Sequence, residues 1–485
     1  MKTNTLDFDA QALRERILDL AMRGKLVPQD PNDEPASVLL EKIKAEKEEL
    51  VKEKKIKKSK PLPAITDDEK PFNIPDSWEW VRFSELFNIE GGSQPPKSTF
   101  SDTGGKGKIR LFQIRDYGEN PVPVYIPIDK AKKISQIGDI LLARYGASLG
   151  KVFFAEYGAY NVALAKVLFN FKSEDFILKK YLFYYFKSEL YQNFVRSNSR
   201  SAQAGFNKSD LNRLVFPVPP ISEQKRIAAK IAQLFALLRK VESSTQQYAE
   251  LQTLLKSKVL NLAMRGKLVK QDPNDEPASV LLEKIKGEKA ELTKEKKIKK
   301  SKPLPPITDE EKPFDIPDSW EWVRLESVCD EIGDIDHKMP RKTINGQYLY
   351  ISPKDFTKNG IDYDHAKRIS EDDFKKLSQK FLPKKGDLIF PRYGTIGIIR
   401  KINTERPVLV SYSCCLIRSN KNMSNDFIQY ELKSKITKKE IDKYVNRSTQ
   451  PNVGLKSIKS FLFPLPPLEE QKRIVSKIIE LFSLL

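Results

Sequence analysis

The chain has 485 residues, too many for one ordinary core, which predicts three or four structural units at roughly 150 residues per domain. Its 85 Lys and Arg residues outnumber 65 Asp and Glu residues and give a net charge of +20. This excess favours a polyanionic partner, most often a nucleic acid, although a merely basic protein or one that binds an anionic membrane would share it. The apolar fraction of 39% is enough to build cores and argues against global disorder.

The cysteines and the N-terminus indicate the compartment. Cys329, Cys414 and Cys415 form an odd, sparse set without the spacing of a zinc site, which argues against a disulfide framework and for a reducing compartment. The N-terminus has no apolar signal core, and no apolar run approaches the ~20 residues of a membrane span. We therefore expect a soluble, cytoplasmic protein without a membrane contact.

The N-terminal helical stretch Leu13–Met22 leads into a segment that the chain repeats. Leu20–Arg82 and Leu262–Arg324 align without a gap at a shift of 242 residues, and only 7 of the 63 positions differ. A period of this length is far above that of solenoid repeats. The repeat therefore indicates duplication of a domain.

The repeated segment contains a predicted helix and a pair of tryptophans. The helix covers Pro35–Lys58 and recurs as Pro277–Lys300, and each copy ends in a lysine-rich run. That run is either a solvated helix end and tether or a contact with phosphate or a partner. The tryptophans of the IPDSWEWVR motif are expected to anchor a core rather than to stack on bases.

After the tryptophans the two copies diverge, over residues 83–215 and 325–462. Both segments are predicted to be mixed α/β, with strands at IRLFQI, YLYIS, DILLARY, DLIFPRY and VLVSYSCCLI. The stretch SEDFILKKYLFYYFKSELYQNFVRS is predicted to be a helix with aromatic residues on its buried face, and DFIQYELKSKITKKEIDKYVNRS is its counterpart.

The divergent segments converge again at two short motifs. These are GDILLARYGASLG (Gly138–Gly150) with GDLIFPRYGTIG (Gly386–Gly397), and FPVPPISEQKRI (Phe216–Ile227) with FPLPPLEEQKRI (Phe463–Ile474). The shift at the second motif is 247, so the second divergent segment is five residues longer. The pattern is that of two divergent inserts between nearly constant joints.

A long helix is predicted after the first proline motif. No Pro or Gly interrupts Ile221–Arg265, a stretch that would span roughly 65 Å as a helix. Apolar residues recur at mostly three- and four-residue steps, the seam of a coiled coil: Ile227, Ile231, Leu234, Leu238, Val241, Tyr248, Leu251, Leu255 and Leu262. Such a seam needs a partner helix.

The two chain ends supply that partner. Leu13–Met22 resembles Leu255–Met264, and Leu468–Leu485 resembles the stretch that begins at Ile221. The ends are therefore predicted to form a second, broken helix antiparallel to the first, as in a circularly closed duplication. Around Lys240–Glu250 the long helix has no match at either end, and the stop at Leu485 leaves the second helix incomplete.

Catalytic signals are scarce. His337 and His365 are the only histidines, and both lie in the second copy, so neither can belong to a shared site. Gly104–Lys108 lacks the spacing of a P-loop. Asp139 and Asp387 recur in a Gly-Asp turn before a strand, where turn capping explains them better than catalysis.

Three recurring patterns could contact nucleic acid, and the first two could equally be structural. Arg144-Tyr145-Gly146 matches Arg392-Tyr393-Gly394: Gly suits a tight hairpin turn, Arg can read guanine or clamp phosphate, and Tyr can donate to phosphate. The polar segments Arg196–Leu211 and Asn446–Ile458 suit phosphate contacts and adenine reading. The basic, proline-containing loops Gly91–Ser98 and Gly333–Thr343 differ in detail, as loops that set specificity would.

These patterns yield a set of candidate nucleic-acid contacts. We predict neither catalytic residues nor a metal site. In the first copy the candidates are Ser93, Gln94, Lys97, Gln113, Arg115, Arg144, Tyr145, Ser148, Arg200, Gln203 and Asn207; in the second they are Lys338, Arg341, Lys354, Arg392, Tyr393, Thr395, Arg447, Gln450 and Asn452.

Together the motifs resemble one family. The LAMRGKLV-QDPNDEPA-LLEKIK linker, the IPxSWEWV motif, the GD-RYG segment and the FPxPPxxEQKRI motif before a long helix resemble the specificity subunit of type I restriction-modification enzymes over nearly the whole chain. No single motif is decisive, but their order, doubled around two divergent inserts, is very specific. A non-enzymatic RNA-binding or coiled-coil scaffold protein is the alternative; it explains the charge and the helices but not the divergent inserts on constant joints.

The resemblance implies a fold. It is a mixed α/β fold with two similar target recognition domains, separated by two antiparallel long helices that form a coiled coil, with pseudo-twofold symmetry. The parts are an N-terminal helix (1–24), a linker with a helix (25–75), recognition domain 1 (76–220), the central helix (221–265), a second linker (266–316), recognition domain 2 (317–467) and a C-terminal helix (468–485).

The resemblance also implies a function. Each recognition domain would read one half of a bipartite, asymmetric double-stranded DNA site, and the helices would fix the distance between the halves. Two methylation subunits would bring S-adenosylmethionine and methylate adenine, and two restriction and translocation subunits would bring ATP and Mg²⁺. This chain would be a non-catalytic subunit that binds no cofactor.

Overall fold

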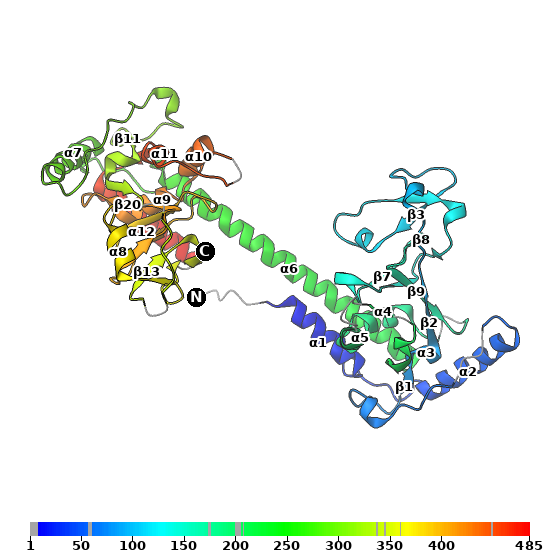
Figure 1. The fold of residues 1–485 in the computed structure, drawn as a ribbon. Coiled ribbons are helices and arrows are strands. Elements are labelled where there is room, and N and C mark those ends of the chain that lie inside the picture. The colour runs from blue at the N-terminus through cyan, green and yellow to red at the C-terminus, as the bar shows by residue number, and fades with distance from the viewer. Residues whose placement is uncertain are drawn as a thin grey trace. The chain divides into compact units, whose positions relative to one another are not determined.

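The computed structural model describes residues 8–56, 61–172, 176–198, 205–206, 208–335, 338–343, 346–358, 360–447 and 450–485. The chain divides into two compact units, Met1–Thr245 and Gln246–Leu485 (Figure 1). The boundary falls inside one helix, α6 (Ile221–Ala263). Each unit combines helices with small sheets, which confirms the predicted mixed α/β class and the duplication.

The described residues of unit 1 form three sheets. Their strand orders are β2-β9-β6-β7, β4-β3-β8-β5 and β1-β10. Besides the first part of α6, its α-helices are α1 (Ala10–Met22), α2 (Ala36–Lys52), α3 (Phe83–Leu86), α4 (Lys179–Lys187) and α5 (Glu189–Asn198). Its strands are β1 (Glu79–Arg82), β2 (Phe87–Gly91), β3 (Lys108–Phe112), β4 (Tyr125–Pro127), β5 (Ile134–Ser135), β6 (Ile140–Ala143), β7 (Val152–Phe154), β8 (Gly158–Tyr160), β9 (Leu164–Phe169) and β10 (Val215–Val218).

Unit 2 repeats this plan with a different second sheet. Its strand orders are β12-β20-β17-β18, β16-β13-β19, β14-β15 and β11-β21. Besides the end of α6, its α-helices are α7 (Ala278–Lys294), α8 (Glu371–Ser378), α9 (Asn425–Glu431), α10 (Lys435–Tyr444), α11 (Leu455–Lys459) and α12 (Leu468–Leu484). Its strands are β11 (Glu321–Arg324), β12 (Cys329–Gly333), β13 (Tyr348–Ile351), β14 (Phe356–Thr357), β15 (Gly360–Ile361), β16 (Lys367–Ile369), β17 (Leu388–Pro391), β18 (Arg400–Lys401), β19 (Val408–Val410), β20 (Cys414–Ser419) and β21 (Leu462–Leu465).

The constant motifs on either side of each insert pair with one another. In unit 1, β1 of the WEWV motif lies antiparallel to β10 of the FPVP motif, from Glu79 opposite Val218 to Arg82 opposite Val215. In unit 2, β11 and β21 pair in the same way. The start and the end of each divergent insert therefore lie side by side, so the insert can vary without moving the joint.

Buried polar contacts lock each joint. Trp78 Nε1 donates to Glu223 at 2.8 Å, and Trp320 Nε1 donates to Glu470 at 2.9 Å. Both carboxylates are buried, which raises their pKa, and each also accepts a hydrogen bond from a linker glutamine. These pairs explain the recurring Trp and Glu-Gln motifs. The burial of Trp78 and Trp320 confirms that they are core anchors.

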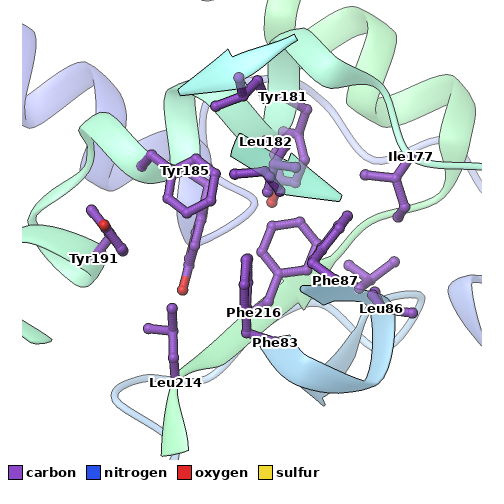
Figure 2. Close-up of a cluster of buried hydrophobic side chains, with 14 of the residues drawn as sticks. Phe83, Leu86, Phe87, Ile177, Tyr181, Leu182, Tyr185, Tyr191, Leu214 and Phe216 are labelled. Carbon is purple, nitrogen blue, oxygen red and sulfur yellow. The ribbon is translucent and has the colours of Figure 1, made fainter. Parts of the chain in front are cut away.

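Aromatic side chains fill the core of unit 1 around the joint (Figure 2). Phe216 of β10 packs edge-on against Phe87 and Tyr185, with ring centroids 5.5 and 4.8 Å apart. The Tyr185 hydroxyl donates to the Val215 carbonyl at 2.8 Å, so this buried polar group is satisfied. The core of unit 2 buries Cys329 and Cys415 instead, and burial raises the pKa of the Cys329 thiol to about 12.

The long helix is observed as predicted, and each unit gives it a partner. In unit 1, α1 lies antiparallel beside α6, with Arg14 paired to Glu242 through two hydrogen bonds of 2.9 and 2.5 Å. In unit 2, α12 packs on the end of α6, and Gln252 donates to the Leu485 carbonyl. Along the predicted seam Ile227 and Ile231 are fully buried, whereas Tyr248 and Leu251 are 51% and 52% exposed. Among the described residues the seam is thus covered near its ends and open in its middle, where the chain ends have no match.

Two of the predicted helices, and the counterpart of each in the other unit, have bounds in the structure that differ from the predicted ones. The predicted Pro35–Lys58 ends at Lys52, and its copy ends at Lys294, because Lys54 and Lys296 adopt a left-handed conformation with φ of 57° that turns the chain out of the helix. The long aromatic helix is two helices, α4 and α5, because Ser188 between them is extended, with ψ of 155°. Its counterpart breaks into α9 and α10, where Ser434 caps the second helix.

Among the described residues, every helix is too short or too polar to cross a membrane.

Candidate nucleic-acid interface

The three recurring segments of unit 1 meet at one end of the sheet β2-β9-β6-β7. We call this group loop cluster 1; its described parts are Gly91–Ser98, Arg144–Ser148 and Gly205–Phe206. Tyr145 forms a β-bridge with Gly205, and the Arg144 Nε donates to the Phe206 carbonyl at a long 3.5 Å. An added Cβ on Gly91 would lie 2.6 Å from Arg144 Nη1, so the guanidinium lies against that glycine.

The matching segments meet in the same way in unit 2. Loop cluster 2 consists of Gly333–Asp334, Arg392–Thr395 and the described part of Asn446–Val453, together with Lys338–Thr343, which continues the loop that Gly333 begins. Asp334 is the residue of this loop that contacts Arg392, whereas the Thr343 N–H donates to the Arg368 carbonyl of β16 at 3.0 Å. Tyr393 forms a β-bridge with Asn452, and the Gly394 N–H donates to the Pro451 carbonyl at 3.0 Å. The glycines of the two tips, Gly146 and Gly394, have φ of 70° and 66°, which confirms the predicted tight turns.

A further turn adjoins each cluster. In unit 1 Gln113 and Arg115 lie in a 3₁₀ turn after β3, where the Gln113 N–H donates to Asp116 at 2.7 Å. In unit 2 Lys354 lies in the equivalent turn after β13, where the Ser352 N–H makes the same bond to Asp355 at 2.7 Å. Arg115 and Lys354, which sequence alone did not pair, therefore occupy equivalent, exposed positions.

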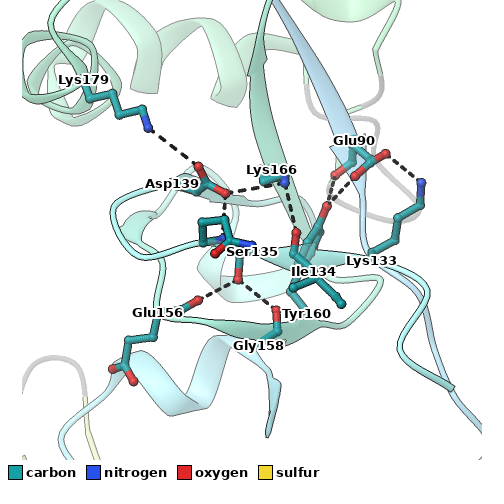
Figure 3. A network of polar contacts seen from close by, with 11 residues as sticks. Glu90, Lys133, Ile134, Ser135, Asp139, Glu156, Gly158, Tyr160, Lys166 and Lys179 are labelled. Atoms are coloured by element: carbon teal, nitrogen blue, oxygen red, sulfur yellow. Dashed lines mark hydrogen bonds and ion pairs between the residues drawn. The ribbon is translucent and has the colours of Figure 1, made fainter. Parts of the chain in front are cut away.

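Polar contacts join the two main sheets beneath loop cluster 1 (Figure 3). Glu90 of β2 accepts hydrogen bonds from Lys133 at 2.7 Å and from the Tyr160 hydroxyl at 3.0 Å. Because of these bonds the pKa of Glu90 is lowered, against the opposing effect of burial. Lys166 of β9 donates to the Ile134 carbonyl at 3.0 Å and pairs with Asp139 at 3.5 Å. This network gives the loops a rigid base.

Asp139 and Asp387 are turn caps, as predicted. Asp139 accepts from the Gln136 N–H at 2.9 Å, and Asp387 accepts from the Lys384 N–H at 2.8 Å. Within the described ranges there is no group of three or more His, Cys, Asp or Glu side chains that could hold a metal ion. His365 pairs with Asp362 at 2.8 Å on the surface, which raises its pKa, and His337 lies outside the described residues.

The candidate contacts differ in their accessibility. Arg200, Gln203 and Asn207 lie outside the described residues. Ser93, Gln113, Arg144, Ser148, Tyr393 and Asn452 are half-buried, and Arg392 is buried. The exposed candidates are Gln94, Lys97, Arg115, Tyr145, Lys338, Arg341, Lys354, Thr395, Arg447 and Gln450. Their contacts with nucleic acid remain predictions.

Sequence reasoning missed one residue of loop cluster 2. Asp334 accepts a hydrogen bond from Arg392 Nη2 at 2.5 Å and another from Lys380 at 2.5 Å. The signal was present in the alignment of the repeats, because the shift of 242 places Asp334 opposite Gly92. Because only the second copy has an acid at this position, the sequence already contained a reason to expect different roles for Arg392 and Arg144.

Known proteins are similar to this chain over nearly its whole length. The model of the type I restriction modification DNA specificity domain matches residues 75–252 and 317–484. The chain is 34% identical to the EcoAI specificity subunit and 32% identical to the EcoEI specificity subunit, type I restriction enzyme subunits of Escherichia coli. Each alignment covers 98% of this chain and 89% of the relative.

A solved structure shares the fold. It comes from work on complex assembly and conformational transition of the type I R-M system, has 19% sequence identity and a TM-score of 0.56, and the match covers 85% of this chain and 92% of that one. With two family matches around one duplicated frame and two relatives above 30% identity over nearly the whole length, the chain belongs to the type I restriction modification DNA specificity domain family.

Proposed function

We propose that this chain is the DNA-specificity subunit of a type I restriction-modification complex, and that loop clusters 1 and 2 each bind one half of a bipartite, asymmetric duplex site. The observation that carries the proposal is the repetition of the cluster. The same three segments meet at the same bridges, Tyr145 with Gly205 and Tyr393 with Asn452, while the side chains around them differ. Two clusters with the same backbone arrangement but different side chains suit one protein that recognises two different DNA sequences.

The charge supports a two-step mode of binding. The net charge of +20 attracts the phosphate backbone whatever the sequence. Exposed polar side chains of each cluster, such as Gln94 and Arg341, then contact base edges, where a good bidentate contact discriminates by about 1–3 kcal/mol. Arg115 and Lys354 occupy equivalent positions beside the clusters, where they suit phosphate contacts that fix the register.

The helices act as frame and docking surface in this proposal. Two methylation subunits dock on the frame and carry S-adenosylmethionine, and two restriction and translocation subunits join with ATP and Mg²⁺. The chain itself supplies recognition and no catalytic group. The open seam around Tyr248 and Leu251 is the part of α6 that the chain's own described helices leave uncovered.

Site selection tests the proposal. The chain, assembled with its methylation subunits, is incubated with a random-sequence duplex library, and bound duplexes are sequenced. We expect two short motifs at a fixed separation. A single contiguous motif, or tighter binding of RNA than of duplex DNA, would contradict the proposal and favour the scaffold alternative.

An exchange of inserts tests which part reads which half. Because both joints pair in the same register, residues 83–215 and 325–462 can be exchanged between β1–β10 and β11–β21. The exchanged chain is expected to select the same two motifs in swapped order. A folded chain with an unrelated motif would show that the inserts do not carry the specificity.

An insertion tests the frame as a ruler. Seven residues inserted after Ser243 preserve a heptad seam, whereas two residues break it. The seven-residue variant is expected to change the separation between the selected motifs. An unchanged separation in a folded variant would show that α6 does not set the spacing.

A further inference from the structure

Arg144 and Arg392 begin the same turn in the two units. The Arg144 N–H donates to the Ala163 carbonyl at 2.9 Å, and the Arg392 N–H donates to the Ser413 carbonyl at 2.9 Å. Each guanidinium lies over the ring of the tyrosine that follows, with 5.1 and 4.7 Å to the ring centroid. The backbone and the tyrosine contact are shared, so any difference in role must come from the neighbours.

In unit 2 a carboxylate holds the guanidinium inside the protein. Asp334 pairs with Arg392 at 2.5 Å, and the two side chains are only 6% and 7% exposed. Lys380 takes the other Asp334 oxygen at 2.5 Å. Because separating a buried ion pair leaves an uncompensated buried charge, Arg392 cannot leave Asp334 for DNA without a large cost.

In unit 1 the corresponding position cannot hold a carboxylate. Asp334 follows Gly333 at the end of β12, and Gly92 follows Gly91 at the end of β2. A Cβ on Gly92 would lie 2.1 Å from the Asn161 carbonyl oxygen, so no side chain fits there without a backbone shift. Among the described residues no acid pairs with Arg144, and the hydrogen bond that its Nε donates to the Phe206 carbonyl is long at 3.5 Å.

We infer that Arg144 contacts DNA in loop cluster 1, whereas Asp334 withholds Arg392 from DNA and makes it a positioning residue for Tyr393. This inference rests on the proposed function and assigns unequal roles to two residues that the sequence motif makes look alike. Loop cluster 1 then offers the Arg144 guanidinium to the DNA. Loop cluster 2 offers the Tyr393 side chain, which packs against the buried pair of Arg392 and Asp334. The difference is a source of unequal sequence preference on one common frame.

Chemical modification of the unaltered protein is the first test. The chain, assembled with its methylation subunits, is treated with 2,3-butanedione, which modifies accessible guanidinium groups, with and without the duplex obtained by site selection. Peptide mass spectrometry is expected to find Arg144 modified in the free complex and protected by the duplex, and Arg392 unmodified in both. Modification of Arg392 that the duplex blocks would overturn the inference.

Matched variants are the second test. Arg144→Gln removes one cation, and the double variant Asp334→Asn with Arg392→Gln removes both charges of the buried pair. It leaves only Lys380 without the Asp334 carboxylate, and that side chain is 43% exposed. The slope of log affinity against log salt is measured on the selected duplex. Arg144→Gln is expected either to lower the slope by ~0.9, for a phosphate contact, or to lower preference for one half-site roughly 5- to 150-fold, for a base contact. The double variant is expected to keep the slope, because Arg392 contacts no phosphate in this inference, and any change in half-site preference would come through Tyr393, which Arg392 positions. A slope that falls by ~0.9 in the double variant would overturn the inference.

The outcomes separate the inference from the proposed function. Selection of no specific duplex by the wild-type complex overturns both. Specific binding that Arg144→Gln leaves unaltered in slope and in half-site preference overturns the inference alone. If the double variant does not fold, the butanedione result on the unaltered protein decides the role of Arg392.

Discussion

The two units share their joints and differ inside their inserts. At the joint, Trp78 and Glu223 make the same contact as Trp320 and Glu470, within 0.1 Å of the same distance. Inside the insert, unit 1 buries Tyr185 three residues before its helix break at Ser188. At the equivalent position, three residues before Ser434, unit 2 buries Glu431. The joint is therefore the part whose chemistry is fixed, and the insert interior is free to change its chemistry while keeping its backbone path.

Removal of a joint tryptophan is expected to have the largest effect. Trp78→Ala opens a cavity and leaves the buried Glu223 without its indole donor, so unit 1 should lose about 3–5 kcal/mol of unfolding free energy. Trp320→Ala should cost unit 2 the same. Hydrogen exchange followed by mass spectrometry measures each unit separately in the full chain.

The neighbouring tryptophans are the control for this prediction. Trp80 and Trp322 are half-buried and pack on Phe72 and Phe314 at 5.2 Å, so their replacement by Ala should cost less. Losses for Trp78→Ala and Trp320→Ala that differ by more than about 2 kcal/mol would show that the joints are not equivalent.

The buried acid of unit 2 is expected to make the units differ in their response to pH. Burial raises the pKa of Glu431 to about 8, from an ordinary value of 4.5. Between these values the folded state keeps a proton that the unfolded state has lost, so the stability of unit 2 falls as pH rises through that range. Tyr185 in unit 1 adds no such dependence near neutral pH because burial raises its pKa far above the ordinary value of 10.0.

Glu431→Gln tests this dependence. The amide stays neutral and its oxygen can still accept from Thr437, which lies 3.1 Å from Glu431. The variant should therefore gain on the order of 2–4 kcal/mol over the parent at pH 9 and little at pH 5. Exchange rates of unit 2 at several pH values measure it, with the exposed Glu405→Gln as the control. An equal effect of Glu431→Gln at both pH values would rule out a raised pKa.

The comparison of units also shows what sequence can predict. The joint was predictable because its residues recur, and matching sequences implied matching contacts. Separately, the uninterrupted apolar spacing predicted α6 to within two residues at its C-terminal end. The break at Ser188 was missed because the aromatic periodicity continues through it, and only a buried, extended serine separates the two helices.

The candidate site was only partly predictable. Sequence reasoning chose the three segments that the fold brings together, since they were the motifs that recur inside the divergent inserts. It could not rank Arg144 against Arg392, because the difference lies in a contact with Asp334, 58 residues away. Long-range ion pairs of this kind depend on the packing of the sheet, which a local motif does not encode.

The smallest expected effect concerns the helix ends that both units share. Lys54 and Lys296 each hold φ of 57°, a conformation that costs an L-residue roughly 1–2 kcal/mol and glycine little. Glycine relieves this strain but loses more conformational entropy on folding, which offsets part of the gain. On balance Lys54→Gly should stabilise unit 1 by about 0.5–1 kcal/mol, and Lys296→Gly should do the same for unit 2.

Exchange rates across α2 and α7 measure the gain. Lys52→Gly, at the last helical position, serves as the control and should destabilise α2. A loss of stability for Lys54→Gly would mean that the lysine side chain makes a contact worth more than the backbone strain. A loss in only one unit would show that the two helix ends differ, although their sequences from Lys52 and Lys294 to Ile56 and Ile298 are the same.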